Sequence, residues 1–172
     1  NGKKKKERNP SGPGQRQISN VISGFYIKRQ DYMWGKALRF GETGSVKLLR
    51  LAKSTSGKWI RKVHETWDIE GKTYTLNHPI LHYPHPTLRE FIADINTFST
   101  LHANANHEEG KKSSIIKIII WPPGKFVYNY ILRFGFLDGT AGFISAMVMS
   151  FHSFLAWSKL WLLQRKHTKI QE

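Results

Sequence analysis

Cysteine is absent from the 172 residues of this chain. Its absence excludes disulfide bonds, thiolate catalysis, and zinc or iron–sulfur sites built on cysteine. The sequence also lacks glycine-rich phosphate loops, the Gly-x-Ser-x-Gly nucleophile motif, the His-Glu-x-x-His zinc motif and any Asp-x-Asp pair that could clamp a metal against a diphosphate. Acidic residues are scarce, with 12 Asp and Glu against 27 Lys and Arg, a formal net charge of +15. A surface this positive favours anionic partners: nucleic acid, phospholipid headgroups, or nucleotide and pyrophosphate ligands.

The composition is that of one folded domain with tails, because 40% of the residues are hydrophobic and 13% are aromatic. It changes along the chain and predicts a basic polar leader over 1–20, short strands over 21–86 and helices over 87–172. The leader, with four consecutive lysines, is either a basic arm for phosphates or a solvated loop. The chain begins with Asn1, so we expect it to be a fragment or a processed product.

Alternating apolar residues predict short strands in the second part of the chain. Strands are expected over 23–29 and 46–54. A hairpin is expected over 63–76, turning at Glu70-Gly71. A last short strand, 79–83, should end before the prolines that follow it.

Helical signals begin at Thr87. Thr87 and Glu90 have the spacing of a capping box. Behind them runs an apolar stripe at helical spacing: Leu88, Phe91, Ile92, Ile95 and Phe98. This helix should reach about Glu109 and end at Gly110. Pro122-Pro123 is expected to end the next element and to open another.

The segment from Thr140 to Trp157 carries no formal charge and allows three interpretations. It could be a helix packed on its own domain, a helix lying in the membrane interface, or a membrane span. Its serines and His152 are costly at the middle of a bilayer. The preceding segment, 121–134, is also amphipathic, aromatic and basic, and anionic lipid attracts such segments by about 1 kcal/mol per Lys or Arg.

Three short motifs could carry chemistry. Glu65 in Val-His-Glu could act as a general base or be an ordinary surface carboxylate, and His64 should point to the opposite face of the strand. His82 and His85 are separated by an extended, proline-bounded path, which favours at most a single metal or phosphate contact completed elsewhere. Asp138, flanked by glycine and an apolar run, either caps the last helix or serves a site.

In combination these features resemble a known family. The string runs from SGFYIKR through LLRLAKSTSGKWIRKVHETWDIEGKTYTLNHPILHY to PPGKFVYNYILRFGFLDGTAGF. Over about residues 18–165 it resembles the C-terminal part of a bacterial family 2 glycosyltransferase, of the lipopolysaccharide core glucosyltransferase type.

The resemblance implies an α/β fold, the C-terminal portion of a GT-A nucleotide-diphospho-sugar transferase, followed by a helical, membrane-associating extension. It implies inverting transfer of a sugar from a nucleotide-sugar donor to a lipid-linked or lipopolysaccharide acceptor at the cytoplasmic face of the membrane. Glu65 falls where the catalytic carboxylate would sit, and His82 where a histidine lies near the metal or diphosphate. His64, Arg61 and Lys62 would contact the acceptor or the diphosphate; Arg50 would form a salt bridge or bind phosphate.

Two departures from the family pattern qualify these expectations. The donor-binding half with its Asp-x-Asp is missing from this chain, so the main ligands of the Mg or Mn ion of the complete enzyme are absent and we expect the isolated chain to be inactive. A Gly-Trp-Tyr-Pro-Asp-like segment is replaced by FGETGSVKLLRL, where Glu42 could substitute. The main alternative is a non-enzymatic, basic, peripheral membrane-binding protein. Nucleic acid is not an expected partner, because the aromatic residues do not lie among the lysines.

Overall fold

The computed structural model describes residues 22–44, 46–60 and 66–170. The strands are β1 (Ile22–Met33), β2 (Lys36–Leu38), β3 (Lys47–Ala52), β4 (Gly57–Ile60), β5 (Thr66–Ile69) and β6 (Lys72–His82). The helices are α1 (Leu88–Glu108), α2 (Ile115–Val127) and α3 (Gly139–Ile170), with a π-helical turn η1 (Tyr128–Leu132) and a 3-10 turn η2 (Gly135–Asp138) before α3. The predicted mixture of helix and sheet is confirmed, with strands first and helices after them.

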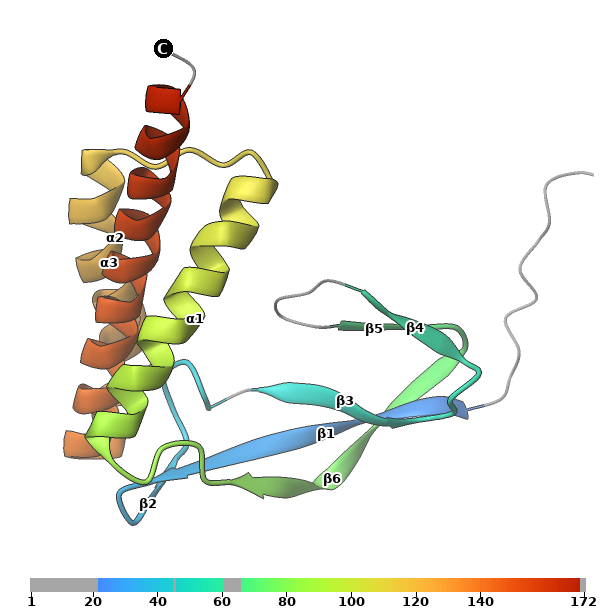
Figure 1. Cartoon of the computed structure of the whole chain (residues 1–172). Helices are drawn as coiled ribbons and strands as arrows, with labels where there is room; N and C mark the ends of the chain where they lie inside the picture. Colours follow the sequence, from blue (N-terminus) through green and yellow to red (C-terminus); the bar gives the residue numbers. More distant parts are fainter. Residues whose placement is uncertain (1–21, 45, 61–65, 171–172) are drawn as a thin grey trace, which may run out of the picture.

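Strand β1 is the centre of the larger sheet. One of its edges pairs antiparallel with β3 near Gly24–Lys28 and with β2 near Asp31–Met33. Its other edge pairs with β6, which runs parallel to it. The sheet therefore extends as an arm away from the helices, while β4 and β5 form a separate ribbon (Figure 1).

The prediction of a hairpin over 63–76 is wrong. Its two halves lie in different sheets, because β5 pairs with β4 and β6 pairs with β1. The ribbon closes over β1 where Gly24 has no side chain: a Cβ at that position would lie 2.7 Å from Cδ1 of Ile69. The strand expected over 79–83 is also not separate, since β6 runs on to His82 through a bulge that contains Pro79. Proline lacks an N–H group and is tolerated at such irregular, edge positions.

Helix α1 begins as predicted. The Oγ1 atom of Thr87 accepts a hydrogen bond from the backbone N–H of Glu90, and the Glu90 carboxylate accepts one from the N–H of Thr87. The helix ends at Glu108, and Gly110 takes the left-handed φ of 71° that follows the C-cap. The predicted apolar stripe is only partly buried, because Phe91 and Ile95 face the core whereas Leu88, Ile92 and Phe98 are exposed.

The expectation that Pro122-Pro123 would end a helix is wrong, because α2 runs through both residues. Proline in a helix interior costs about 3 kcal/mol, so packing has to offset it. The indole ring of Trp121 stacks on that of Trp157 at 6.2 Å, and Phe126 meets Phe143 edge-on at 5.8 Å. In addition, the Ser150 hydroxyl donates a hydrogen bond to the Pro122 carbonyl. These contacts hold α2 against α3 despite the two prolines.

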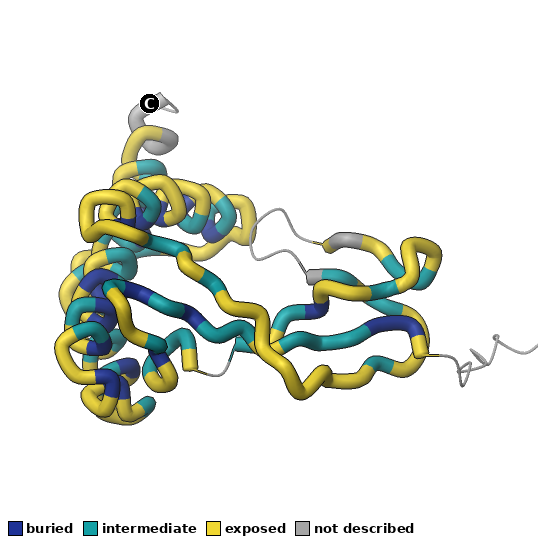
Figure 2. The backbone as a smooth tube through the Cα atoms, turned by 90° about the horizontal axis from the view of Figure 1, so that it is seen from below, coloured by how far each residue is buried: buried dark blue, intermediate teal, exposed yellow. Residues whose placement is uncertain are grey.

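The core lies where the sheet meets the helices. It is formed by the side chains of Met33, Leu38, Phe91, Ile95 and Val148. The buried positions gather at this end of the molecule, whereas much of the arm is exposed (Figure 2). Helix α3 lies between α1 and α2, and the Lys159 ammonium ties it to the Ser99 hydroxyl and the Asn96 side chain of α1.

By length and composition alone, the helical segment Gly135–Lys166 could cross a membrane. The segment packs on α1 and α2, and 28% of its most apolar window is buried inside the protein. A membrane location, the GT-A assignment and the division of the chain at 20 and 86 stay predictions.

Candidate functional site

One face of the arm carries a concavity of about 230 Å³. Because side chains alternate along a strand, Ile27 and Arg29 of β1 share a face, and Ile80 and His82 of β6 lie beside them. From β3, Leu48 and Arg50 complete the lining together with Lys28. The lining thus combines apolar side chains with basic ones.

A bulge in β3 involves Arg50. Phe25 pairs with Leu51 and Tyr26 with Leu49, so Arg50 is the extra residue between them. Bulges of this kind redirect a side chain relative to regular strand alternation. Arg50 is exposed, and it is the β3 residue that brings positive charge to the concavity.

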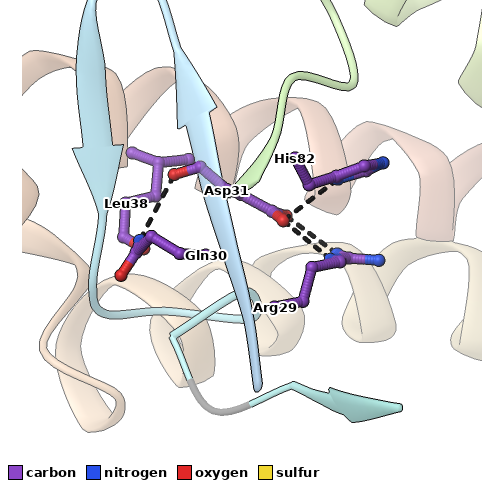
Figure 3. A network of polar contacts seen from close by, with 5 residues as sticks. All are labelled: Arg29, Gln30, Asp31, Leu38 and His82. Atoms are coloured by element: carbon purple, nitrogen blue, oxygen red, sulfur yellow. Dashed lines mark hydrogen bonds and ion pairs between the residues drawn. The ribbon is translucent and has the colours of Figure 1, made fainter. Parts of the chain in front are cut away.

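A buried carboxylate holds two of the basic side chains in place. Asp31 is 1% exposed, and its Oδ1 and Oδ2 atoms accept hydrogen bonds from Nε (2.7 Å) and Nη2 (2.8 Å) of Arg29. Its Oδ1 atom also lies 3.1 Å from Nδ1 of His82 (Figure 3). On the neighbouring strand β2, the Leu38 carbonyl accepts a hydrogen bond from Gln30. With Nδ1 turned to the carboxylate, the Nε2 atom of His82 remains for a ligand.

Two of the known-protein comparisons yield no match: neither a protein-family model nor a solved structure matches the chain. Curated relatives do match. The lipopolysaccharide core biosynthesis glycosyltransferase LpsC of Rhizobium meliloti is 30% identical over 146 residues, 83% of this chain and 54% of its own. Uncharacterized glycosyltransferases of Rickettsia bellii and Rickettsia felis are 33% and 30% identical over 96 residues, 54% of this chain and about a third of theirs.

The chain is a homologue of bacterial glycosyltransferases. It spans about half the length of LpsC and a third of the Rickettsia proteins.

The structure brings together two of the site residues expected of such a homologue. Arg50 and His82 come from different strands, β3 and β6, and line the same concavity. Glu65, His64, Arg61 and Lys62 lie outside the described residues.

Sequence reasoning missed Arg29 and Asp31. The strand was expected to stop at Arg29, whereas β1 continues to Met33. An Arg and an Asp two residues apart on a strand share a face, and that spacing is the signal that could have identified the pair.

The described residues do not by themselves fit a divalent metal ion. Within 22–44, 46–60 and 66–170, no three His, Asp or Glu side chains lie close enough together to hold one. Asp31 is already engaged by Arg29 on both oxygen atoms. His82 could offer a single ligand atom.

The second histidine of the Leu-His-Tyr-Pro-His-Pro motif has a different partner. His85 Nδ1 lies 3.1 Å from Oδ2 of Asp94, and its ring stacks on Phe91 at 4.1 Å. Burial lowers the pKa of His85, and the nearby Asp94 carboxylate opposes this shift. His82 and His85 thus belong to separate clusters.

Asp138 joins the sheet to the helices. Its carboxylate is buried and accepts hydrogen bonds from the backbone N–H groups of Arg39 (3.0 Å) and Phe40 (2.9 Å). These bonds fix the loop after β2, a structural role that differs from both expectations for Asp138, a helix cap or a place in a site. Nearby, Glu42 accepts hydrogen bonds from Lys125 and Asn129, both at 3.0 Å. Neither acid lines the Arg50–His82 concavity, so the structure gives no support to an acceptor contact by Glu42 in that concavity.

Proposed function

We propose that this chain is part of an inverting glycosyltransferase that moves a sugar from a nucleotide-sugar to a lipid-linked or lipopolysaccharide-type acceptor. One wall of its active site would be the β3–β1–β6 face, within a GT-A type fold. The homology to glycosyltransferases supports the reaction class. The observation that carries the assignment of the site is that Arg50 and His82, far apart in sequence, line one basic concavity.

The charges of this concavity suit the leaving group of the reaction. As the acceptor oxygen attacks the anomeric carbon, the bond to the diphosphate breaks and its electron pair stays on the diphosphate. Cationic side chains placed beforehand stabilise that growing charge. Lys28 and Arg50 bring positive charge to the concavity, and Arg29 adds a guanidinium that its ion pair with Asp31 keeps in a fixed position. We therefore assign this face to phosphate binding.

Glu65 is proposed as the general base that takes the proton of the acceptor hydroxyl, with His64, Arg61 and Lys62 contacting acceptor or diphosphate. This part of the proposal rests on the family resemblance. A Mg or Mn ion would receive at most His82 from the described residues, so its other ligands have to come from elsewhere.

The phosphate-binding face can be tested on the chain itself. Titration with inorganic pyrophosphate and with nucleoside diphosphates, followed by calorimetry, should show binding that Arg50→Ala weakens about tenfold, the loss of one charge-assisted contact. Arg89→Ala is the matched control, because Arg89 is exposed on α1 and does not line the concavity. If Arg50→Ala and Arg89→Ala bound pyrophosphate with equal affinity, the β3–β1–β6 face would not be the phosphate-binding site.

The reaction can be tested in a transferase that contains this chain. Glu65→Gln should lower turnover by about three orders of magnitude or more while the affinity for the donor persists, because only the proton acceptor is lost. Unchanged turnover would exclude Glu65 as the base. The isolated chain should transfer no sugar, and measurable transfer by it would contradict the proposal that a further donor-binding part is needed.

A second candidate is a non-enzymatic, basic, membrane-binding protein, the alternative raised by the composition. The exposed isoleucines of α2 favour it. Lipid binding by itself does not separate the two candidates, because a transferase with a lipid-linked acceptor would also bind lipid. Pyrophosphate binding at Arg50 does separate them, since only the transferase needs it.

A further inference from the structure

The polar side chains that line the concavity on the β3–β1–β6 face are of two kinds. Lys28, Arg29 and Arg50 can only donate hydrogen bonds, because lysine and arginine side chains carry no acceptor. His82 of β6 is the remaining polar residue of the lining. A histidine ring nitrogen donates or accepts according to which nitrogen carries the proton. The state of the His82 ring therefore decides which groups, besides phosphate, this concavity can recognise.

The contact with Asp31 places a proton on Nδ1 of His82. The Asp31 carboxylate binds Arg29 through both oxygen atoms, as an ionised carboxylate does, and such a group has only acceptor sites. The Nδ1 atom of His82, 3.1 Å from Oδ1 of Asp31, therefore has to donate. At about pH 7.5 an ordinary imidazole is mostly neutral, so its other nitrogen, Nε2, carries a lone pair. Nε2 is then a hydrogen-bond acceptor, unlike the other polar groups of the lining.

This acceptor lies on the same side of Asp31 as one of the donors. Asp31 of β1 and His82 of β6 are partners in the parallel strand register. The His82 side chain is 41% exposed, whereas that of Asp31 is 1% exposed. Figure 3 shows the His82 imidazole and the Arg29 guanidinium extending from Asp31 in the same direction. A ligand held by Arg29 in the concavity is therefore offered an acceptor at the same place.

This combination of donors and one acceptor suits a ligand with a phosphate and a hydroxyl group close together. The phosphate oxygens accept from the lysine and arginine side chains, and the hydroxyl donates to Nε2. Sugar phosphates carry both groups, and the aliphatic side chains of Ile27, Leu48 and Ile80 can pack on the C–H groups of a sugar ring. The concavity of about 230 Å³ is smaller than the range of about 300–1,000 Å³ for sites of drug-sized ligands. It thus suits the sugar phosphate part of a ligand better than a whole nucleotide-sugar.

A metal ion is the other partner that could take the lone pair of Nε2. Such an ion needs several protein ligands, and the part of the chain that the structure describes brings no three His, Asp or Glu side chains together. Both oxygen atoms of the neighbouring Asp31 are already bound by Arg29. A hydroxyl group needs only Nε2 itself, so the arrangement favours a hydroxyl.

We propose that the Asp31–His82 pair makes this concavity selective for a phosphate with a neighbouring sugar hydroxyl. His82 accepts the hydrogen bond of the hydroxyl, and Asp31 is a positioning residue that keeps Nε2 free of a proton. The proposal rests on the proposed function, because it assigns a ligand to the same phosphate-binding face. The sugar phosphate belongs either to the nucleotide-sugar donor or to a phosphorylated acceptor glycan.

Calorimetric titration of the full chain tests the selectivity. The probes are glucose 1-phosphate, glucose 6-phosphate and cyclohexyl phosphate, which has a ring of the same size without hydroxyl groups; EDTA removes metal ions. The chain should bind a sugar phosphate about tenfold more tightly than cyclohexyl phosphate, the effect of one hydrogen bond. His82→Phe should lower this ratio to about one. His78→Phe is the matched control and should retain the ratio, because His78 is exposed on the same strand and does not line the concavity.

Nitrogen-15 NMR of the imidazole rings tests the role of Asp31 separately, with His82→Phe identifying the His82 signals. In the unaltered chain at about pH 7.5, Nδ1 of His82 should carry the proton, and the Nε2 signal should shift when the sugar phosphate binds. Asp31→Asn should give a mixture of the two tautomers, which a purely structural role of Asp31 would not produce. A proton on Nε2 in the unaltered chain would overturn the proposal, whether or not the variant folds.

The titrations also separate this proposal from the proposed function. Equal affinities for the sugar phosphates and cyclohexyl phosphate, all weakened by Arg50→Ala, would overturn the selectivity and leave the phosphate-binding face in place. A preference that appears only with added Mg²⁺ or Mn²⁺ would assign Nε2 to a metal ion and overturn it as well. Binding of none of the probes would overturn both. A stronger preference for glucose 1-phosphate supports the donor as the source, and one for glucose 6-phosphate supports the acceptor.

Discussion

The two ends of β1 lie in different surroundings. At its C-terminal end, Met33 packs in the core with Leu38 and the helices. At its N-terminal end, the arm has a few buried residues such as Leu49, while its strand β6 is exposed along nearly all of its length. The same strand thus anchors the fold at one end and presents side chains at the other.

This difference separates stability from binding. The helix end holds the apolar contacts and the buried Asp138, so substitutions there should act on folding. The arm holds Arg50 and His82 on an open face, so substitutions there should act on ligands.

The largest effect is expected for Leu38→Ala. Leu38 is 1% exposed in the core, and truncation of such a residue leaves a cavity that lowers the free energy of unfolding by about 3 kcal/mol. Leu51→Ala, on the exposed surface of β3, should cost less than about 0.5 kcal/mol. Urea denaturation followed by circular dichroism measures both. Similar losses would show that the arm contributes as much to the core as the helix end does.

Asp138→Asn should come next, with a loss of about 2 kcal/mol. The amide retains one acceptor oxygen, but its NH₂ group then faces backbone N–H groups that need an acceptor. Thermal unfolding measures the change, and pyrophosphate binding should stay intact in the folded variant. If binding failed while the fold persisted, the two regions would be coupled.

Thr87→Ala removes the hydroxyl that caps α1 and should cost about 1 kcal/mol. Thr97→Ala, an exposed threonine within the same helix, serves as the control because it caps nothing. Chemical denaturation of the two variants under identical conditions makes the comparison. A loss no larger than that of the control would mean that tertiary contacts alone set the start of α1.

The smallest effect concerns pH and His85. Its folded-state pKa lies below the usual 6.5 because the ring is buried, so the unfolded chain binds the proton more readily. Stability from this group is therefore fully present above about pH 6.5 and declines as the pH falls from there through the lower, folded-state pKa. Urea denaturation between about pH 5 and 7.5 should show a shallower decline for His85→Gln than for the unaltered chain. Identical pH profiles of the two proteins would exclude His85 as the source of the pH dependence of stability.

The sequence predicted the parts of the fold that local chemistry decides. The capping box at Thr87, the glycine stop at Gly110 and the strand expected over 46–54 need only neighbouring residues. All are confirmed, the strand with the narrower bounds Lys47–Ala52. The pairing of β6 with β1 was not predictable in this way. Glu70-Gly71 indicates a turn before β6, but it does not indicate which strand β6 pairs with. The prediction that Pro122-Pro123 ends a helix was wrong because the contacts that offset the cost of the two prolines come from α3, which lies elsewhere in the sequence.

The candidate site was predictable to a similar extent. Arg50 and His82 were proposed from a family resemblance, and the structure then placed both at one concavity. Asp31 was missed because the strand was expected to stop at Arg29. The spacing of the two residues could have paired them, but a local pattern does not reveal that Asp31 is buried or that it contacts a histidine of another strand. Residues that act through long-range contacts are therefore recognised only in the folded structure.

The parallel pairing of β1 with β6 also bears on how the chain folds. In the sequence, β2, β3 and the whole β4–β5 ribbon lie between them. The two strands can therefore pair only after this intervening stretch has formed a long closed loop, which costs conformational entropy. Contacts between residues so distant in sequence slow the search for the native state. Shortening or stiffening that stretch should therefore change the rate of refolding more than the final stability.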